Sequence, residues 1–165
     1  MAVEDKYSNT DLTNKNFAVP GTGGTKAISF RGVATVAAAD DDGSKYRLFR
    51  VPATFRPTRC IIATTAITGG TDYDLGIYDT QAQGGAVIDR DNLMDGQTMA
   101  SATRSIDGLS NVALADLGAG KSIGELCGLT QAQAIQKGEV DVVLTANTVG
   151  SAAGTIVVEL LGYAA

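Results

Sequence analysis

The sequence of 165 residues contains no histidine. Histidine is the side chain whose unperturbed pKa lies closest to neutrality, and it is the usual general base, proton shuttle and metal ligand. Its absence excludes Ser-His-Asp and Cys-His nucleophilic sites and removes the commonest protein ligand of zinc and iron. The sequence therefore favours a non-enzymatic, structural role, and no cofactor is expected.

Aromatic residues and cysteines are also scarce. Aromatics make up 5% of the chain and tryptophan is absent, so the core must consist mainly of Val, Ile, Leu and Ala, which pack into a sandwich more readily than around a large ligand cavity. The two cysteines, Cys60 and Cys127, lie in apolar sequence and form no Cys-x-x-Cys motif. Buried free thiols are the favoured interpretation, and a disulfide or a reactive thiol is the alternative.

Long apolar runs and an excess of positive charge are missing as well. No apolar run approaches the roughly 20 residues that cross a bilayer, and the polar start of the chain lacks the features of a secretory signal. The net charge of −5 argues against sequence-independent binding to nucleic-acid backbones. We therefore expect a protein that is made in the cytoplasm and contacts neither membranes nor nucleic acid directly.

The residue pattern divides the chain into an arm and one domain. Residues 1–25 are polar, have no helical or strand period and end in a Pro-Gly-rich stretch, which predicts an extended N-terminal arm. Residues 26–165 suffice for a single domain with a substantial core. Alternation of apolar and polar residues predicts strands over 27–38, 45–51, 58–67, 72–79 and 84–89. The first two are expected to form a flat hairpin around an Asp-rich turn.

The last third of the sequence combines short helices with the clearest strands. Ser122 and Thr130 each begin a capping-box pattern, and Gly138 is placed to end the second helix. Residues 140–147 and 155–161 alternate strongly and predict an antiparallel hairpin. Its inward side chains should share one core: Val142, Leu144, Ile156, Val158 and Leu160. The predicted fold is all-β, an antiparallel β-sandwich or jelly-roll with one or two short helices.

Two segments resemble ligand-binding motifs without completing them. Asp40 and Asp42 in the Asp-rich turn carry carboxylates that suit calcium, but Val51 stands where an EF-hand loop needs Glu. Asp and Gly are also preferred in turns, so these two residues are kept as calcium candidates and no metal site is predicted. Residues 118–122 resemble the end of a phosphate-binding loop, but the complete motif needs a glycine at position 115, which is Ala. A helix start is the favoured interpretation there.

The charged residues are segregated into two blocks. The acidic block contains one basic residue, Arg90, and six aspartates: Asp72, Asp74, Asp79, Asp89, Asp91 and Asp95. Asp72 and Asp74 should lie on the solvent face of their strand. Paired carboxylates also serve glycoside hydrolysis, but no tryptophan is present to hold a sugar. The basic block contains no acidic residue and comprises Lys45, Arg47, Arg50, Arg56 and Arg59.

This segregation suits a head-to-tail contact between copies or docking on a larger charged partner. A nucleic-acid patch is the alternative, but few aromatics are interleaved with the basic residues. We expect a homo-oligomer, a trimer, because a polar arm and an apolar C-terminal strand would both be stabilised by contact with a neighbouring subunit. The residues predicted to form contacts are Tyr7, Lys45, Arg47, Arg50, Arg56, Arg59, Asp72 and Asp74.

Four segments together resemble tailed-bacteriophage virion structural proteins, most of all the small capsid decoration, or cement, proteins. The segments are residues 1–8, 42–48, 72–79 and 141–161. The resemblance implies a β-sandwich or jelly-roll body, often trimeric, and no catalytic residues. It also implies synthesis in the host cytoplasm and a place on the capsid surface of the virion.

The function expected from this resemblance is to bind the outside of a phage capsid and stabilise it by bridging major capsid protein units. The added contacts would resist the pressure of packaged DNA. Two alternatives remain open: a tail, neck or fibre-base component of the virion, and a carbohydrate-binding module. A carbohydrate-binding module would need an exposed aromatic cluster.

Overall fold

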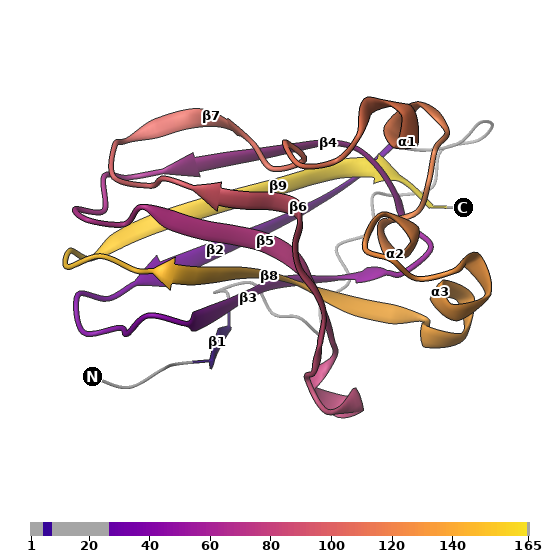
Figure 1. The fold of residues 1–165 in the computed structure, drawn as a ribbon, viewed down its shortest axis with the longest axis horizontal. Coiled ribbons are helices and arrows are strands. Elements are labelled where there is room, and N and C mark those ends of the chain that lie inside the picture. The colour runs from indigo at the N-terminus through magenta and orange to yellow at the C-terminus, as the bar shows by residue number, and fades with distance from the viewer. Residues whose placement is uncertain (1–4, 8–26, 165) are drawn as a thin grey trace.

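The computed structural model describes residues 5–7 and 27–164. Within these residues the chain forms two β-sheets packed face to face, with three short α-helices gathered at one end of the sandwich (Figure 1). The apolar side chains of both sheets meet in a single core. The predicted all-β sandwich is therefore confirmed.

The two sheets differ in size and in strand direction. One has five strands in the order β1-β3-β8-β5-β6, with β1 parallel to β3 and the other neighbours antiparallel. These strands are β1 (Asp5–Tyr7), β3 (Ser44–Pro52), β8 (Glu139–Thr148), β5 (Asp72–Asp79) and β6 (Val87–Gln97). The other sheet has four antiparallel strands in the order β2-β9-β4-β7. They are β2 (Ala27–Val36), β9 (Gly154–Tyr163), β4 (Arg56–Thr64) and β7 (Thr103–Asp107).

Neither predicted hairpin forms. β2 pairs with β9 while β3 pairs with β8, so residues 27–38 and 45–51 lie in opposite sheets. β8 and β9 likewise lie in opposite sheets. Alternation shows which face of a strand is buried, but not which strand lies beside it. Gly32 marks where β2 passes close to β3, because a Cβ at that position would lie 2.7 Å from the carbonyl oxygen of Leu48.

The middle of the chain contains more strand than the sequence pattern predicts. The 3-10 turn η1 (Gln81–Gln83) precedes β6, which begins at Val87 and extends eight residues beyond the predicted limit of 89. β7 was not predicted at all. Both are edge strands, and the pairing of β6 with β5 shifts register at three points. A strand with such irregular pairing does not keep a clean two-residue period.

The core confirms the predicted inward face of the last two strands. Each of the five predicted side chains is at most 1% exposed: Val142, Leu144, Ile156, Val158 and Leu160. They face one another across the sandwich rather than along a hairpin. Cys60 and Cys127 are buried and not bonded to each other, as expected for free thiols. The core is mostly aliphatic, with Phe30 packed edge-on against Phe55 at 5.1 Å between ring centroids.

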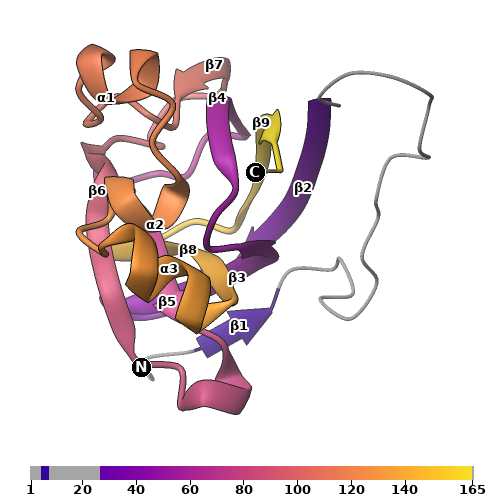
Figure 2. The ribbon, with the colours of Figure 1, turned by 90° about the vertical axis from the view of Figure 1, so that its right-hand side faces the viewer.

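The helices close one end of the sandwich (Figure 2). Both predicted capping boxes form, at Ser122 and Thr130, and the second helix ends at Gly138 with φ +76°. The structure has one helix that the sequence did not predict, the one preceded by Ala113. An alanine side chain cannot cap a helix, so the sequence carries no capping signal at that position. The helices are α1 (Leu114–Gly118), α2 (Ile123–Leu126) and α3 (Gln131–Lys137). None of the helices in the described part is long and apolar enough to span a membrane.

The predicted arm enters the described structure only at β1. Asp5–Tyr7 pairs in parallel with residues 45–47 of β3. These three residues therefore extend a sheet, although the sequence has no strand period there. The other residues of the predicted 1–25 arm lie outside the described residues.

Candidate contact surface

Arg47 of β3 is buried on the outer face of the five-stranded sheet. Its Nη1 lies 3.1 Å from Oδ2 of Asp141, and its side chain is 1% exposed. Nε of Arg50 lies 2.8 Å from the other carboxylate oxygen of Asp141. Two arginines from β3 thus share one fully buried carboxylate on β8. Arg47 was predicted to form contacts with a partner, but its side chain is enclosed by its own chain.

The remaining donors of Arg47 hold the turn that leads into β6. Nη1 donates to the carbonyl oxygen of Asp79 and Nη2 to that of Gly85, both at 3.0 Å. The guanidinium also lies 5.7 Å from the centroid of the Tyr78 ring. Arg47 therefore fastens the β5–β6 connection onto the sheet, which is a structural role.

Asp74 is also buried, so the prediction that it lies on a solvent face is wrong. It is 0% exposed, accepts a hydrogen bond from Nδ2 of Asn147 at 2.6 Å and pairs with Nε of Arg90 at 3.0 Å. The cause is the irregular pairing of β6 with β5, which brings the β6 backbone against Gly76: a Cβ at Gly76 would lie 2.1 Å from the carbonyl oxygen of Asp89. Asp72, two residues earlier on β5, is half-buried and accepts from the same Asn147 amide at 3.1 Å.

Three carboxylates of the acidic block gather around Arg90. Carboxylate oxygens of Asp74, Asp91 and Asp95 all lie within 4.8 Å of one another. The pKa of Asp95 is raised, first by loss of solvation and then by the negative charges of Asp74 and Asp91. Arg90 pairs with Asp74 and lies 3.9 Å from Asp91, so the protein itself supplies a compensating cation.

The two calcium candidates serve the turn instead. Oδ2 of Asp40 accepts hydrogen bonds from the Ala37 amide at 2.9 Å and the Tyr46 hydroxyl at 2.7 Å. Oδ1 of Asp42 accepts from the Val149 amide at 2.9 Å. Within the described residues neither joins a cluster of three metal-ligating groups. Burial raises the pKa of Tyr46, so its hydroxyl remains a proton donor to Asp40.

The basic block does not form one patch, because β3 and β4 belong to different sheets. Lys45 and Arg50 are half-buried on the five-stranded sheet. Arg56 is half-buried and Arg59 is exposed, both on the four-stranded sheet. Tyr7 lies opposite Arg47 in the pairing of the β1 and β3 backbones, and the position of its side chain is not described.

The outer face of the four-stranded sheet carries a half-covered apolar stripe between polar side chains. Val33, Val157 and Ala63 stand side by side across β2, β9 and β4, and each is half-buried. Ile61 and Leu161 extend this stripe. These outward-facing positions alternate with core residues along each strand. The sequence alone does not identify them as a contact surface, because polar residues are expected on the outward face.

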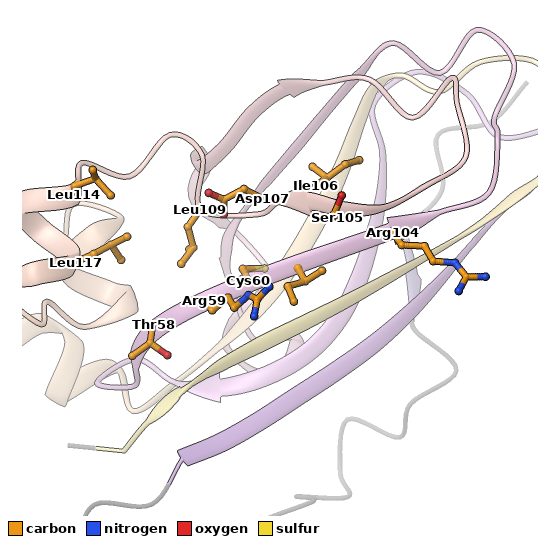
Figure 3. Close-up of a pocket in the computed structure, with 11 residues that line it drawn as sticks. Thr58, Arg59, Cys60, Arg104, Ser105, Ile106, Asp107, Leu109, Leu114 and Leu117 are labelled. Atoms are coloured by element: carbon orange, nitrogen blue, oxygen red, sulfur yellow. The ribbon is translucent and has the colours of Figure 1, made fainter.

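An apolar groove adjoins this stripe between β4, β7 and α1 (Figure 3). It encloses about 430 Å³. Leu109, Leu114 and Leu117 form its apolar end, and Leu114 is 85% exposed. Arg59 and Asp107 lie on its rim strands, and Cys60 lies beneath it (Figure 3). Burial and the charge of Asp107 raise the pKa of Cys60 to about 12, so this thiol stays protonated.

The fold is shared with a chain from a phage capsid. A chain in the structure of the capsid of Ralstonia phage GP4 superposes with a TM-score of 0.62 over 96% of this chain and 97% of that chain, at 16% sequence identity. A chain in the cyanophage Pam1 capsid asymmetric unit matches over 95% and 99% with 16% identity and a TM-score of 0.48. No protein-family model and no curated protein sequence matches this chain. The similarity to the first chain establishes a common fold along nearly the whole length of both.

Proposed function

We propose that this protein is a virion structural protein that binds the outside of a phage capsid and stabilises it by bridging major capsid protein units. The observation that carries the proposal is the fold shared along nearly the whole chain with a capsid chain of Ralstonia phage GP4. The resemblance of four sequence segments to capsid decoration proteins supports the same conclusion. On this proposal the protein is made in the host cytoplasm and resides on the capsid surface.

The surface of the four-stranded sheet supports a contact role. A half-covered apolar stripe continues into a groove that ends at the exposed Leu114. Apolar surface of this kind, with arginines at its edge, is typical of protein contact sites. Burying the groove against capsid units on both sides of a boundary would add contact energy that must be lost before the units separate.

The buried titratable groups support a non-catalytic role. The carboxylates of Asp40, Asp74 and Asp141 each hold hydrogen bonds or ion pairs that fasten turns and strands. Burial raises the pKa of both Cys60 and Cys127, which opposes formation of a nucleophilic thiolate. These groups therefore have structural roles in the fold.

The aromatic residues do not favour the carbohydrate-binding alternative. Tyr46, Tyr73 and Tyr78 are buried, and no aromatic side chain placed by the structure among the described residues is exposed. Sugar-binding sites need an open aromatic face on which the ring can stack. The capsid role is therefore the better supported of the two.

We propose that the protein associates as a trimer on the capsid. The apolar stripe of Val33, Ala63 and Val157 supports contact with a neighbouring subunit, because cyclic assembly buries such surfaces. Sedimentation velocity at about tens of micromolar should give one species of three chains. A monomer at this concentration would contradict self-association.

The capsid role is tested with capsids assembled from the major capsid protein encoded in the same genome. The purified protein should co-sediment with them, saturate at a fixed ratio and raise the temperature at which the particles break. Purified tails serve as the control. Failure to bind capsids, or binding to tails alone, would overturn the proposal and favour a tail or fibre-base component.

A further inference from the structure

A buried hydrogen-bond donor without an acceptor lies where β4 begins, opposite the end of β9. The pairing of these strands places Arg56 directly opposite Tyr163. The Nε–H of Arg56 is buried and has no hydrogen-bond partner within the described part of the chain. Buried polar groups in proteins are almost always hydrogen-bonded, so this N–H leaves the guanidinium charge poorly compensated, and an ion pair with the half-exposed part of Arg56 would stabilise it.

Gly120 packs closely against this pair. Its φ of +66° favours glycine, and a Cβ at this position would lie 3.1 Å from Oη of Tyr163 and 3.5 Å from Nη1 of Arg56. The hydroxyl and the guanidinium therefore approach the same point. We call this place, formed by Arg56, Tyr163 and Gly120, the arginine corner.

The carboxylates nearest the arginine corner are engaged elsewhere. Oε2 of Glu125 accepts hydrogen bonds from the amide and hydroxyl of Ser122, at 2.9 and 2.8 Å. These two bonds are the main reason that the pKa of Glu125 is lowered, and the charge of Arg56 contributes less. Asp116 pairs with Nζ of Lys121 at 2.7 Å. Among the described residues, no carboxylate forms an ion pair with Arg56.

The arginine corner is continuous with apolar surface. Beside it lies a hollow of about 420 Å³ lined by Ala27, Thr58, Gly162 and Tyr163. Thr58 also lines the groove of Figure 3, which ends at Leu114 and Leu117. A ligand that reached from the corner into the groove would therefore meet first a cation and then an aliphatic wall.

We propose that the arginine corner and the adjoining groove receive a carboxylate-bearing segment of the major capsid protein. The carboxylate would pair with the Arg56 guanidinium and accept the Tyr163 hydroxyl proton in a hydrogen bond, and a neighbouring apolar side chain would pack against Leu114 and Leu117. This inference rests on the proposed function and adds the chemistry of its contact. Charge-assisted bonds from arginine to a carboxylate are strong and directional, which suits a fixed docking position.

The test is Arg56→Gln in the full-length protein, titrated onto capsids of the major capsid protein encoded in the same genome. We expect its dissociation constant to rise at least about 30-fold, as when one partner of a buried charge pair is removed. The midpoint of unfolding of the free variant should change little, because among the described residues only the minor charge interaction with Glu125 is lost. Arg31→Gln makes the same charge change at an exposed position of β2 that lines neither the groove nor the hollow, and it should change binding by less than about threefold.

Each other outcome overturns the inference in a distinguishable way. If the wild type binds capsids and Arg56→Gln binds equally well, the arginine corner is not the contact, although the proposed function stands. If the free variant unfolds more readily and Arg56→Lys restores its stability but leaves capsid binding unchanged, Arg56 has a structural role. If the substitution instead abolishes self-association of the free protein, the occupant is a second copy. If the wild type does not bind capsids, the proposed function fails and so does the partner named here.

Discussion

Replacing Val158 with Asp tests the packing of the two sheets against each other. Val158 is 0% exposed at the centre of β9, between Gly32 of β2 and Ile62 of β4. Removing the two methyl groups in Val158→Ala should cost about 2 kcal/mol, because apolar area is lost and the surrounding residues relax only partly. An aspartate at the same place must bury a charge or take up a proton, which raises the cost to about 4 kcal/mol or more. That loss approaches the whole stability of a typical domain, about 5–15 kcal/mol.

The assay is urea unfolding followed by far-UV circular dichroism, with Glu159→Lys as the matched control. Glu159 points to the opposite face, is half-buried and accepts one hydrogen bond, from Ser29 at 2.9 Å. Its replacement should cost no more than about 1 kcal/mol. If Val158→Asp and Glu159→Lys both lower the free energy of unfolding by the same small amount, one face of β9 is not buried. The packing of the two sheets against each other would then be refuted as well.

Three further substitutions test the interactions that hold the five-stranded sheet and the helices. Asp141→Asn should destabilise the protein by about 3–5 kcal/mol in urea unfolding, because it leaves the buried Arg47 without its carboxylate; a loss below about 1 kcal/mol would contradict this ion pair. Gly76→Ala should cost more than about 2 kcal/mol, because its Cβ would meet Asp89 of β6 at 2.1 Å; an unchanged thermal midpoint would show that the β6 backbone does not lie against Gly76. Hydrogen bonds from Ser122 lower the pKa of Glu125, so its ionised form stabilises the fold above the unfolded pKa of about 4.3, and this contribution is lost as the pH falls through the lower folded pKa. Glu125→Gln should therefore be less stable than the wild type at neutral pH and equal to it in strong acid, and a pH-independent difference in thermal midpoint would oppose this reasoning.

The sequence predicted the buried faces of strands better than their neighbours. Residues 140–147 and 155–161 alternate cleanly, and their inward side chains lie in the core as expected. The pairing of β8 with β3 and β5, and of β9 with β2 and β4, depends on contacts far apart in the chain, which alternation does not encode. Both capping boxes were predictable because the signal of each lies within four residues.

The candidate site was predictable only in part. Arg47 and Asp74 were expected at the surface because charged residues are rarely buried. Their partners Asp141 and Asn147 lie on β8, far along the chain, and no local pattern indicates that such pairs will form. Arg56 was selected from its place in the basic block, but its lack of an acceptor depends on how β4, β9 and the loop at Gly120 come together.

The most direct test of the central proposal is an electron cryo-microscopy reconstruction of capsids saturated with this protein. The capsids are assembled from the major capsid protein of the same genome and compared with undecorated ones. The account predicts added density on the outer surface, at junctions between capsid units, into which the two-sheet sandwich fits. Density confined to a tail attachment vertex, or capsids that carry no added density, would contradict the account.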